Sequence, residues 1–138
     1  MTDSKLKLLY DQIKEDILTT TISTATIGSD NRETHFPTAS IEFGGGETNS
    51  DVNTVIDREV GLYIRVKGDD QDQVEYATQE IMILWKGNGN ELMGVLRDLD
   101  CIRIEPVGMV PPMIKSGTTT MPVYADLQFQ MTVRYSYT

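Results

Sequence analysis

Apolar residues recur along the chain at two spacings, and each spacing predicts its own type of secondary structure. Near the N-terminus they lie three or four residues apart, which predicts an amphipathic helix over residues 4–19 with Asp3 or Ser4 as its N-cap. The same spacing between Gly68 and Gly87 predicts a second helix. The apolar positions are Leu6, Leu9, Tyr10, Ile13 and Ile17 in the first helix, and Val74, Ala77, Ile81, Leu84 and Trp85 in the second.

Alternation of apolar and polar residues predicts the strands. It occurs in residues 38–43, 55–67, 101–107 and 124–137, and the last of these segments is long for a strand. The first two segments predict a hairpin with a long loop that contains three consecutive glycines. Residues 19–28 predict a short strand at most, and residues 91–99 a short third helix or a turn.

The order of these elements predicts an α+β fold. It gives a helix, a hairpin, a second helix and then a second antiparallel pair of strands. We therefore expect an antiparallel or mixed sheet with two main helices packed on one face. A chain of 138 residues has the size of a single domain, so residues 1–138 are expected to share one core.

The net charge excludes one class of function. At −9, with twelve basic residues scattered along the chain, the sequence argues against tight binding to nucleic acid, which depends on clustered Lys and Arg. No run of 18 apolar residues occurs, and acids and lysines interrupt the apolar pattern of the N-terminus. The sequence therefore supports no membrane span and no signal peptide, and we expect a cytoplasmic protein.

The residues that most often carry chemistry are few and isolated. Cys101 is the only cysteine and His35 the only histidine, so a small buried strand residue is the expected role of Cys101. The Gly44–Gly46 segment lacks the Lys and the following helix of a phosphate-binding loop. We predict no catalytic residue, no cofactor and no metal ligand, and hence no enzyme.

An acidic cluster precedes the second helix. Asp69, Asp70, Asp72 and Glu75 lie where carboxylates cap a helix and oppose its dipole. The alternative is a divalent cation site in an acidic metal-dependent enzyme, although the spacing differs from that of an EF-hand loop.

The long C-terminal strand allows two interpretations. It pairs along its whole length inside its own sheet, or it leaves an edge that pairs with another chain. Its polar face is the predicted subunit contact, formed by Gln128, Gln130, Thr132 and Arg134. A module that recruits a peptide strand to this edge is a further alternative.

The whole pattern resembles the tail terminator proteins of long-tailed bacteriophages, also called tail completion or tail-to-head joining proteins. The likeness extends over almost the whole chain and rests on the order and lengths of the elements and on the final strand. The matching segments are SKLKLLYDQIKEDIL, TASIEFGGG, VIDREVGLYIRVKG, DQVEYATQEIMILW and YADLQFQMTVRYSYT.

This resemblance implies a structural virion protein that acts by contact and without a cofactor. Such proteins form a homo-oligomeric ring, typically a hexamer, that ends the tail tube and presents a surface to the head. The implied partners are the tail tube protein and the head connector or neck protein, and DNA passes through the lumen without specific binding. The implied location is the phage tail, assembled in the host cytoplasm. Another neck or tail tube protein of the same assembly is the alternative.

By the same resemblance, the hairpin loop is the expected contact with the tail tube or the head connector. The predicted contact residues are Gly44, Gly45, Gly46, Glu47, Thr48, Asn49, Ser50 and Asp51. Because this loop carries acids, its partner surface is expected to be neutral or basic. The alternative is a loop without a contact.

Overall fold

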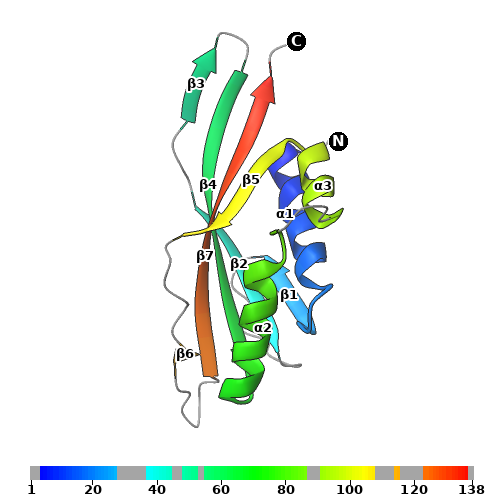
Figure 1. Cartoon of the computed structure of the whole chain (residues 1–138), viewed down its shortest axis with the longest axis vertical. Helices are drawn as coiled ribbons and strands as arrows, with labels where there is room; N and C mark the ends of the chain where they lie inside the picture. Colours follow the sequence, from blue (N-terminus) through cyan, green and yellow to red (C-terminus); the bar gives the residue numbers. More distant parts are fainter. Residues whose placement is uncertain are drawn as a thin grey trace.

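Three helices and seven strands make up the described part of the chain (Figure 1). The computed structural model describes residues 4–27, 37–44, 48–52, 55–86, 91–107, 114–115 and 123–136. The helices are α1 (Lys5–Ile17), α2 (Gln71–Ile83) and α3 (Glu91–Asp98). The strands are β1 (Thr24–Ile27), β2 (Thr38–Gly44), β3 (Thr48–Val52), β4 (Val55–Gly68), β5 (Cys101–Pro106), β6 (Ile114–Lys115) and β7 (Val123–Ser136).

All the strands belong to one mixed sheet. Its main order is β1-β2-β4-β7-β5, while β3 pairs with β4 and β6 pairs with β7. The β1–β2 pair is parallel and the other pairs are antiparallel. The predicted α+β class with a mixed sheet is confirmed.

Two long strands run through the middle of this sheet. Strands β4 and β7 have 14 residues each and pair along their whole length, from Val55 opposite Ser136 to Gly68 opposite Val123. Figure 1 shows them spanning the long axis of the molecule. The predicted length of the C-terminal strand is therefore confirmed, and its length is matched by that of its neighbour.

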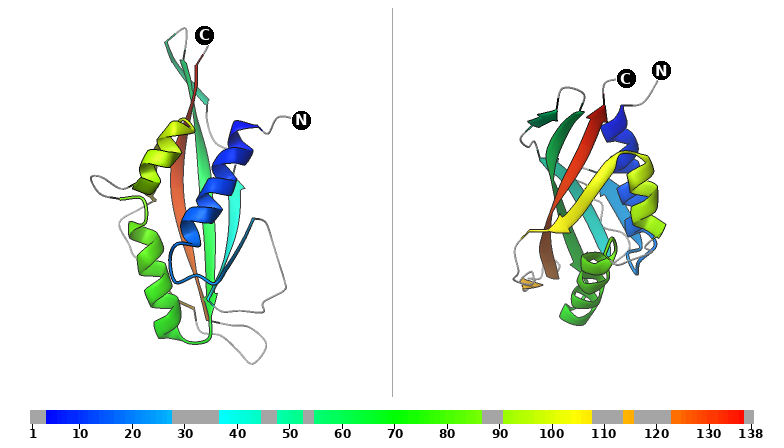
Figure 2. Two further views of the ribbon diagram at one scale, coloured as in Figure 1. Left: turned by 90° about the vertical axis from the view of Figure 1, so that its right-hand side faces the viewer. Right: turned by 45° about the horizontal axis from the view of Figure 1, so that its top comes forward.

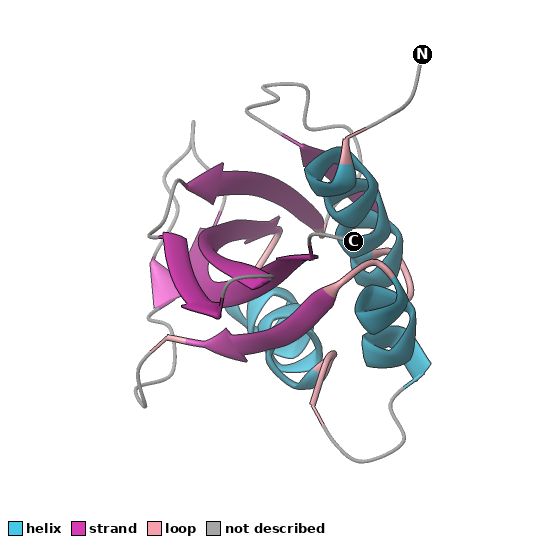
Figure 3. Ribbon diagram, turned by 90° about the horizontal axis from the view of Figure 1, so that it is seen from above, coloured by secondary structure: helices cyan, strands magenta, loops and turns pink. Residues whose placement is uncertain are grey.

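The helices lie on one face of the sheet, as predicted (Figure 3). Alternation along the strands directs every second side chain toward them. On β7 these inward residues are buried, and the Phe129 ring meets the Trp85 ring edge-on with centroids 5.4 Å apart. The largest fully buried side chains are Phe129, Leu9, Ile13, Ile17, Ile41, Leu62, Ile64, Ile81, Leu96, Met131, Val60 and Val66.

Side-chain caps fix where the two main helices begin. The Ser4 hydroxyl accepts a hydrogen bond from the backbone N–H of Lys7 at 3.2 Å, which selects Ser4 from the two predicted caps. At α2, the Asp70 carboxylate accepts from the Gln73 N–H at 2.8 Å. Both bonds satisfy donors that the first helical turn leaves free.

The buried residues of strand β5 differ from those that the sequence predicts. Simple alternation places Ile102 and Ile104 on the same side, opposite Cys101, but the structure buries Cys101 and Ile104 together and leaves Ile102 half-buried. The register shifts between Cys101 and Arg103, where a β-bulge inserts one residue against β7. Such a bulge changes the phase of the alternation, so the prediction was wrong at Ile102.

The predicted hairpin is present, but its loop is shorter than expected. Strand β2 pairs with β4 from Thr38 opposite Lys67 to Gly44 opposite Gly61. Part of the predicted loop, Thr48–Val52, is then strand β3, which pairs with the remainder of β4. Polar residues form this strand because β4 extends past Gly61 and offers them backbone partners.

Candidate functional site

Strand β3 and the adjoining ends of β4 and β7 form an extension of the sheet that we call the arm. It comprises residues 48–52, 55–59 and 132–136. Figures 1 and 2 show these three strand segments reaching beyond the helices, with the C-terminal end of the chain beside them. The outer end of the arm therefore projects past the helices.

The structure describes only part of the segment predicted to contact the tail tube or the head connector. Gly44 ends β2, and Thr48, Asn49, Ser50 and Asp51 lie in β3 on the arm. Gly45, Gly46 and Glu47 lie outside the described residues. The register shifts between Ser50 and Val52 at a β-bulge.

Charged side chains join the strands of the arm. The Arg134 guanidinium donates to both oxygens of Asp57, at 2.8 and 3.0 Å, and this pair joins β7 to β4. Hydrogen bonding to Arg134 holds the pKa of the Asp57 carboxyl below its usual value. The first turn of α1 adds Lys5, whose ammonium donates to the Arg134 carbonyl at 3.1 Å and lies 4.9 Å from the centre of the Tyr135 ring.

A turn residue with a left-handed backbone completes this junction. Asp100, between α3 and β5, has φ of 69°, a conformation that short polar side chains tolerate better than most. Its carbonyl accepts from the Arg134 N–H at 2.9 Å, and its carboxylate lies 2.8 Å from the Lys5 ammonium. The first turn of α1 and the α3–β5 turn therefore meet β7 within the arm, at Arg134 and Tyr135.

The uncovered face of the sheet carries cross-strand polar pairs. Arg65 on β4 donates to both carboxylate oxygens of Asp126 on β7, at 2.7 and 3.1 Å, and its guanidinium lies 4.5 Å from the centre of the Tyr124 ring. Gln130 donates to Glu59 at 2.7 Å. Arg65 and Asp126 are directly opposite each other, while Gln130 and Glu59 form a diagonal pair, and both arrangements bring side chains within reach. Strands β4 and β7 are therefore joined by side chains as well as by their backbone ladder.

In the middle of this face, a tyrosine ring packs over two glycines. Gly44 and Gly61 lie opposite each other, and a Cβ atom added to either would come within 3.0 or 3.1 Å of the Tyr63 ring. Tyr63 is 43% exposed, so its ring covers the backbone of both glycines and leaves its other side to solvent. The contact of Tyr63 with these glycines was not predicted from the sequence, although a glycine inside an alternating strand is a recognised sign of close approach.

The four predicted subunit-contact residues all lie on the uncovered face. Gln128 and Gln130 are exposed, and Arg134 is half-buried in its pair with Asp57. Thr132 is the least accessible of the four, with only 7% of its surface exposed. Its neighbours across the two ladders are Glu59 on β4 and Arg103 on β5, and such long side chains shield a short one between them.

The position of β7 decides between the two interpretations of the long strand. It is an interior strand, since β4 pairs with all of it and β5 and β6 pair with parts of its other side. Near the ends of β5, the Gln128 carbonyl and the Arg134 N–H are also bonded, to Val107 and Asp100. Pairing inside its own sheet is therefore correct, and this counts against a peptide-binding edge on β7.

The acidic cluster has a structural role at α2. Asp70 is the N-cap and Asp72 lies in the first turn, where a carboxylate opposes the helix dipole. Among the described residues, no three acidic, His or Cys side chains come together as a group that could hold a metal ion. Cys101 is buried as predicted, and burial raises the pKa of its thiol to about 11; His35 lies outside the described residues.

A buried carboxylate that the sequence analysis overlooked joins α1 to the end of α2. Asp16 is 1% exposed and accepts hydrogen bonds from the Trp85 indole and the Gln12 amide, both at 2.9 Å. Burial raises the pKa of the Asp16 carboxyl above its ordinary value. An acid beside Ile13 and Ile17 on the apolar stripe of α1 was the available sign.

No family model matches the chain, and no curated protein matches it. Within the described residues, no helix is both long and apolar enough to span a membrane.

Proposed function

We propose that the chain is a structural protein of a long-tailed bacteriophage, forming a ring that terminates the tail tube and provides the head-joining surface. The arm is the observation that carries this proposal. Its strands β4 and β7 are joined by the Asp57–Arg134 pair, and it extends past the helices where a neighbouring protein can reach it. The sequence resemblance to the tail terminators supports the same function.

The arm offers a suitable contact for ring closure. Within the described part of the chain, β3 pairs with β4 alone, so its other edge has backbone donors and acceptors available to another chain. A contact between two different surfaces of one protein, repeated around an axis, closes into a ring. The same strand carries Thr48–Asp51, which the sequence predicts to contact the tail tube or the head connector.

Native mass spectrometry tests the ring directly. The expected result is a closed oligomer, with six copies as the family typically has. Monomers in isolation and also in the presence of tail tubes would contradict the proposal. Growth of the purified chain into open tubes would instead support the tail tube alternative.

Removal of residues 45–53 tests the role of the arm. We expect this deletion to abolish tail joining while the monomer stays folded, because Val55–Glu59 keep their pairing with β7. A matched control replaces residues 45–53 by a Gly/Ser linker of the same length, which separates loss of the β3 contact from a shortened connection. Unchanged joining by both variants would show that β3 makes no functional contact.

A further inference from the structure

Helix α2 has a second apolar stripe that its packing on the sheet does not use. Tyr76 and Ile83 are 60% and 67% exposed, the highest values among the large hydrophobic side chains of the described residues. Seven residues make about two turns, so these side chains share one side of the helix, about 10 Å apart along its axis. Isolated exposed apolar residues are ordinary, but two on one face of one helix form a patch.

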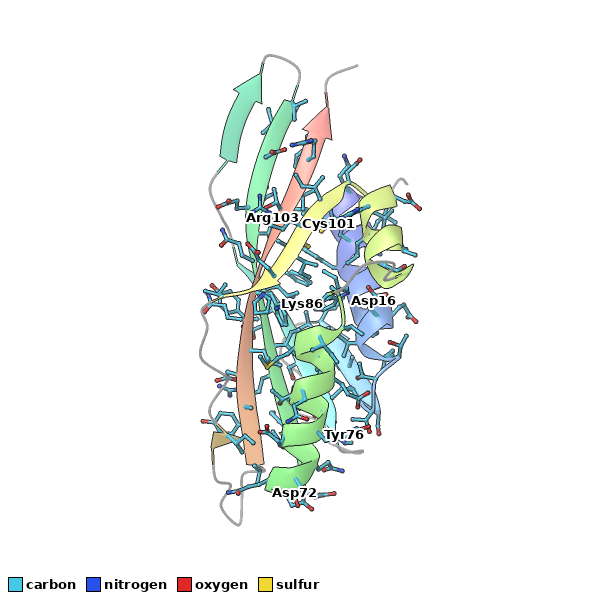
Figure 4. The ribbon with its side chains drawn as sticks, in the orientation of Figure 1. Asp16, Asp72, Tyr76, Lys86, Cys101 and Arg103 are labelled. Atoms are coloured by element: carbon cyan, nitrogen blue, oxygen red, sulfur yellow. The ribbon has the colours of Figure 1, made fainter. Side chains whose placement is uncertain are left out.

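This stripe lies opposite the face that builds the core. The buried residues Val74 and Ile81 lie nearly half a turn from Tyr76 around the helix, and the buried Ala77 lies about 100° from it. Figure 4 shows Tyr76 and Asp72 on the outer side of α2, directed away from the sheet. One face of α2 therefore packs on the sheet, while the opposite face is exposed to solvent.

Acidic side chains outnumber basic ones near Tyr76 and Ile83, although Lys86 follows Ile83 by three residues and Glu80 accepts a hydrogen bond from the Thr21 N–H at 3.2 Å. The segment Gln71–Ile83 contains no Lys or Arg, and its acids are Asp72, Glu75 and Glu80. Asp72 lies one turn before Tyr76 on the same stripe, while Glu75 and Glu80 fall on its two sides. Asp69 and Asp70 add negative charge just before the helix.

We propose that this outer face of α2 is a docking surface for a partner protein whose apolar side chains are flanked by Lys and Arg. Self-association of two α2 faces would bring acids against acids, which disfavours a second copy as the occupant. A basic rim on the partner complements the acids, and its apolar centre covers Tyr76 and Ile83. The inference goes beyond the proposed ring, because the surface exists in a single chain whatever its assembly.

The composition of the patch suits a specific contact. Tyrosine is enriched among the side chains that dominate protein interfaces, because it buries a large area and loses little conformational freedom. The Asp70 cap and the buried face fix α2 before any partner arrives, so little ordering is needed on binding. The acids are expected to make the interaction depend on salt.

Fluorescence anisotropy with a labelled peptide tests this surface. The probe is a synthetic helical peptide of Leu and Lys with Leu on one side only, and the full chain is titrated into it. We expect saturable binding that weakens at least tenfold in Tyr76→Ser and in Ile83→Ser. Circular dichroism checks that both variants remain folded, as expected for exposed positions.

Matched controls separate this interaction from general attraction between opposite charges. Leu8→Ser removes an apolar side chain of α1 that is 43% exposed, and it should bind like the parent chain. A peptide of the same composition without an apolar side should bind at least tenfold more weakly. Equal binding of both peptides, or an equal loss in Leu8→Ser, would overturn the proposal.

Sedimentation of the chain without peptide tests the competing occupant. If Ile83→Ser abolishes self-association of the parent chain, a second copy covers α2 and the proposed basic partner is wrong. We expect the oligomeric state to be the same for Ile83→Ser and for the parent chain.

Discussion

The two faces of the sheet are stabilised by different interactions. Beneath the helices, β4 and β7 contribute fully buried side chains such as Leu62 and Phe129. On the uncovered face, the same strands carry the Arg65–Asp126 pair and the Tyr63 ring, all partly exposed. Stability therefore depends mainly on the covered face, so changes to the contacts of the other face destabilise the fold little.

Phe129→Ala should have the largest effect. The ring is 1% exposed and packs edge-on against Trp85, and its removal leaves a cavity that costs about 3–5 kcal/mol of unfolding free energy. Urea unfolding followed by circular dichroism measures this. The neighbouring Gln128→Ala on the uncovered face is the control, with a change within about 0.5 kcal/mol. Similar losses of unfolding free energy in both variants would contradict the inference that the covered face contributes most of the stability.

Two glycines of β4 provide the next test. A Cβ atom at Gly68 would lie 2.9 Å from the buried Val74 side chain, so Gly68→Ala should cost about 1–3 kcal/mol. At Gly61 the nearest atom belongs to Tyr63, whose exposed ring can move away, and Gly61→Ala should cost less than about 1 kcal/mol. Thermal unfolding of the two variants should rank them in this order, and the reverse order would contradict it.

The substitution Asp16→Asn tests whether the buried Asp16 carboxyl makes the stability of the chain depend on pH. Folding raises the pKa of Asp16, so its protonated form is favoured in the folded state. The resulting stability is fully present below the unfolded pKa and is lost as pH rises through the folded pKa. The Asn variant has no such titration and can still accept from Trp85.

Urea unfolding at a series of pH values measures this difference. From pH 3 to pH 7 we expect the Asn variant to gain stability relative to the parent chain. A constant difference between the two across this range would show that Asp16 does not titrate differently in the folded chain.

The Arg65–Asp126 pair should show the smallest effect. Both side chains are about half exposed, so a double-mutant cycle with Arg65→Met and Asp126→Asn should give a coupling of about 0.2–1 kcal/mol. Salt at 1 M should reduce it, because exposed charges are screened. If 1 M salt left the coupling energy unchanged, the Arg65–Asp126 pair would be shielded from solvent, and the uncovered face would not be as solvated as we infer.

The elements that bury one complete face could be predicted from the sequence. The two main helices and strands β4 and β7 carry long apolar patterns, and these determined both their type and their approximate ends. Strand β3 could not be predicted, because TNSDV has no alternation and pairs only where β4 already offers a partner. The bulge in β5 could not be predicted either, because one inserted residue shifts the alternation of buried and exposed positions without a local sign in the sequence.

The candidate site was predicted only in part. The position of Thr48–Asp51 near the end of the molecule follows from the hairpin, but the strand that holds them depends on long-range pairing. The Arg134–Asp57 pair joins residues 77 positions apart, and a sequence gives no register for such pairs. The exposure of Tyr76 and Ile83 needed the packing of α2, which alone shows which side faces the sheet.

The full-length pairing of β4 and β7 also has a mechanical consequence. The arm is at one end of this pair, and Gly68 and Val123 are at the other. A force that pulls β4 at the arm while β7 is held at Val123 acts along the strands, so the rungs of the ladder share it and resist together. A force that separates Val55 from Ser136 acts on one rung at a time. The same two strands are therefore strong in shear along the long axis and weak against peeling at the arm.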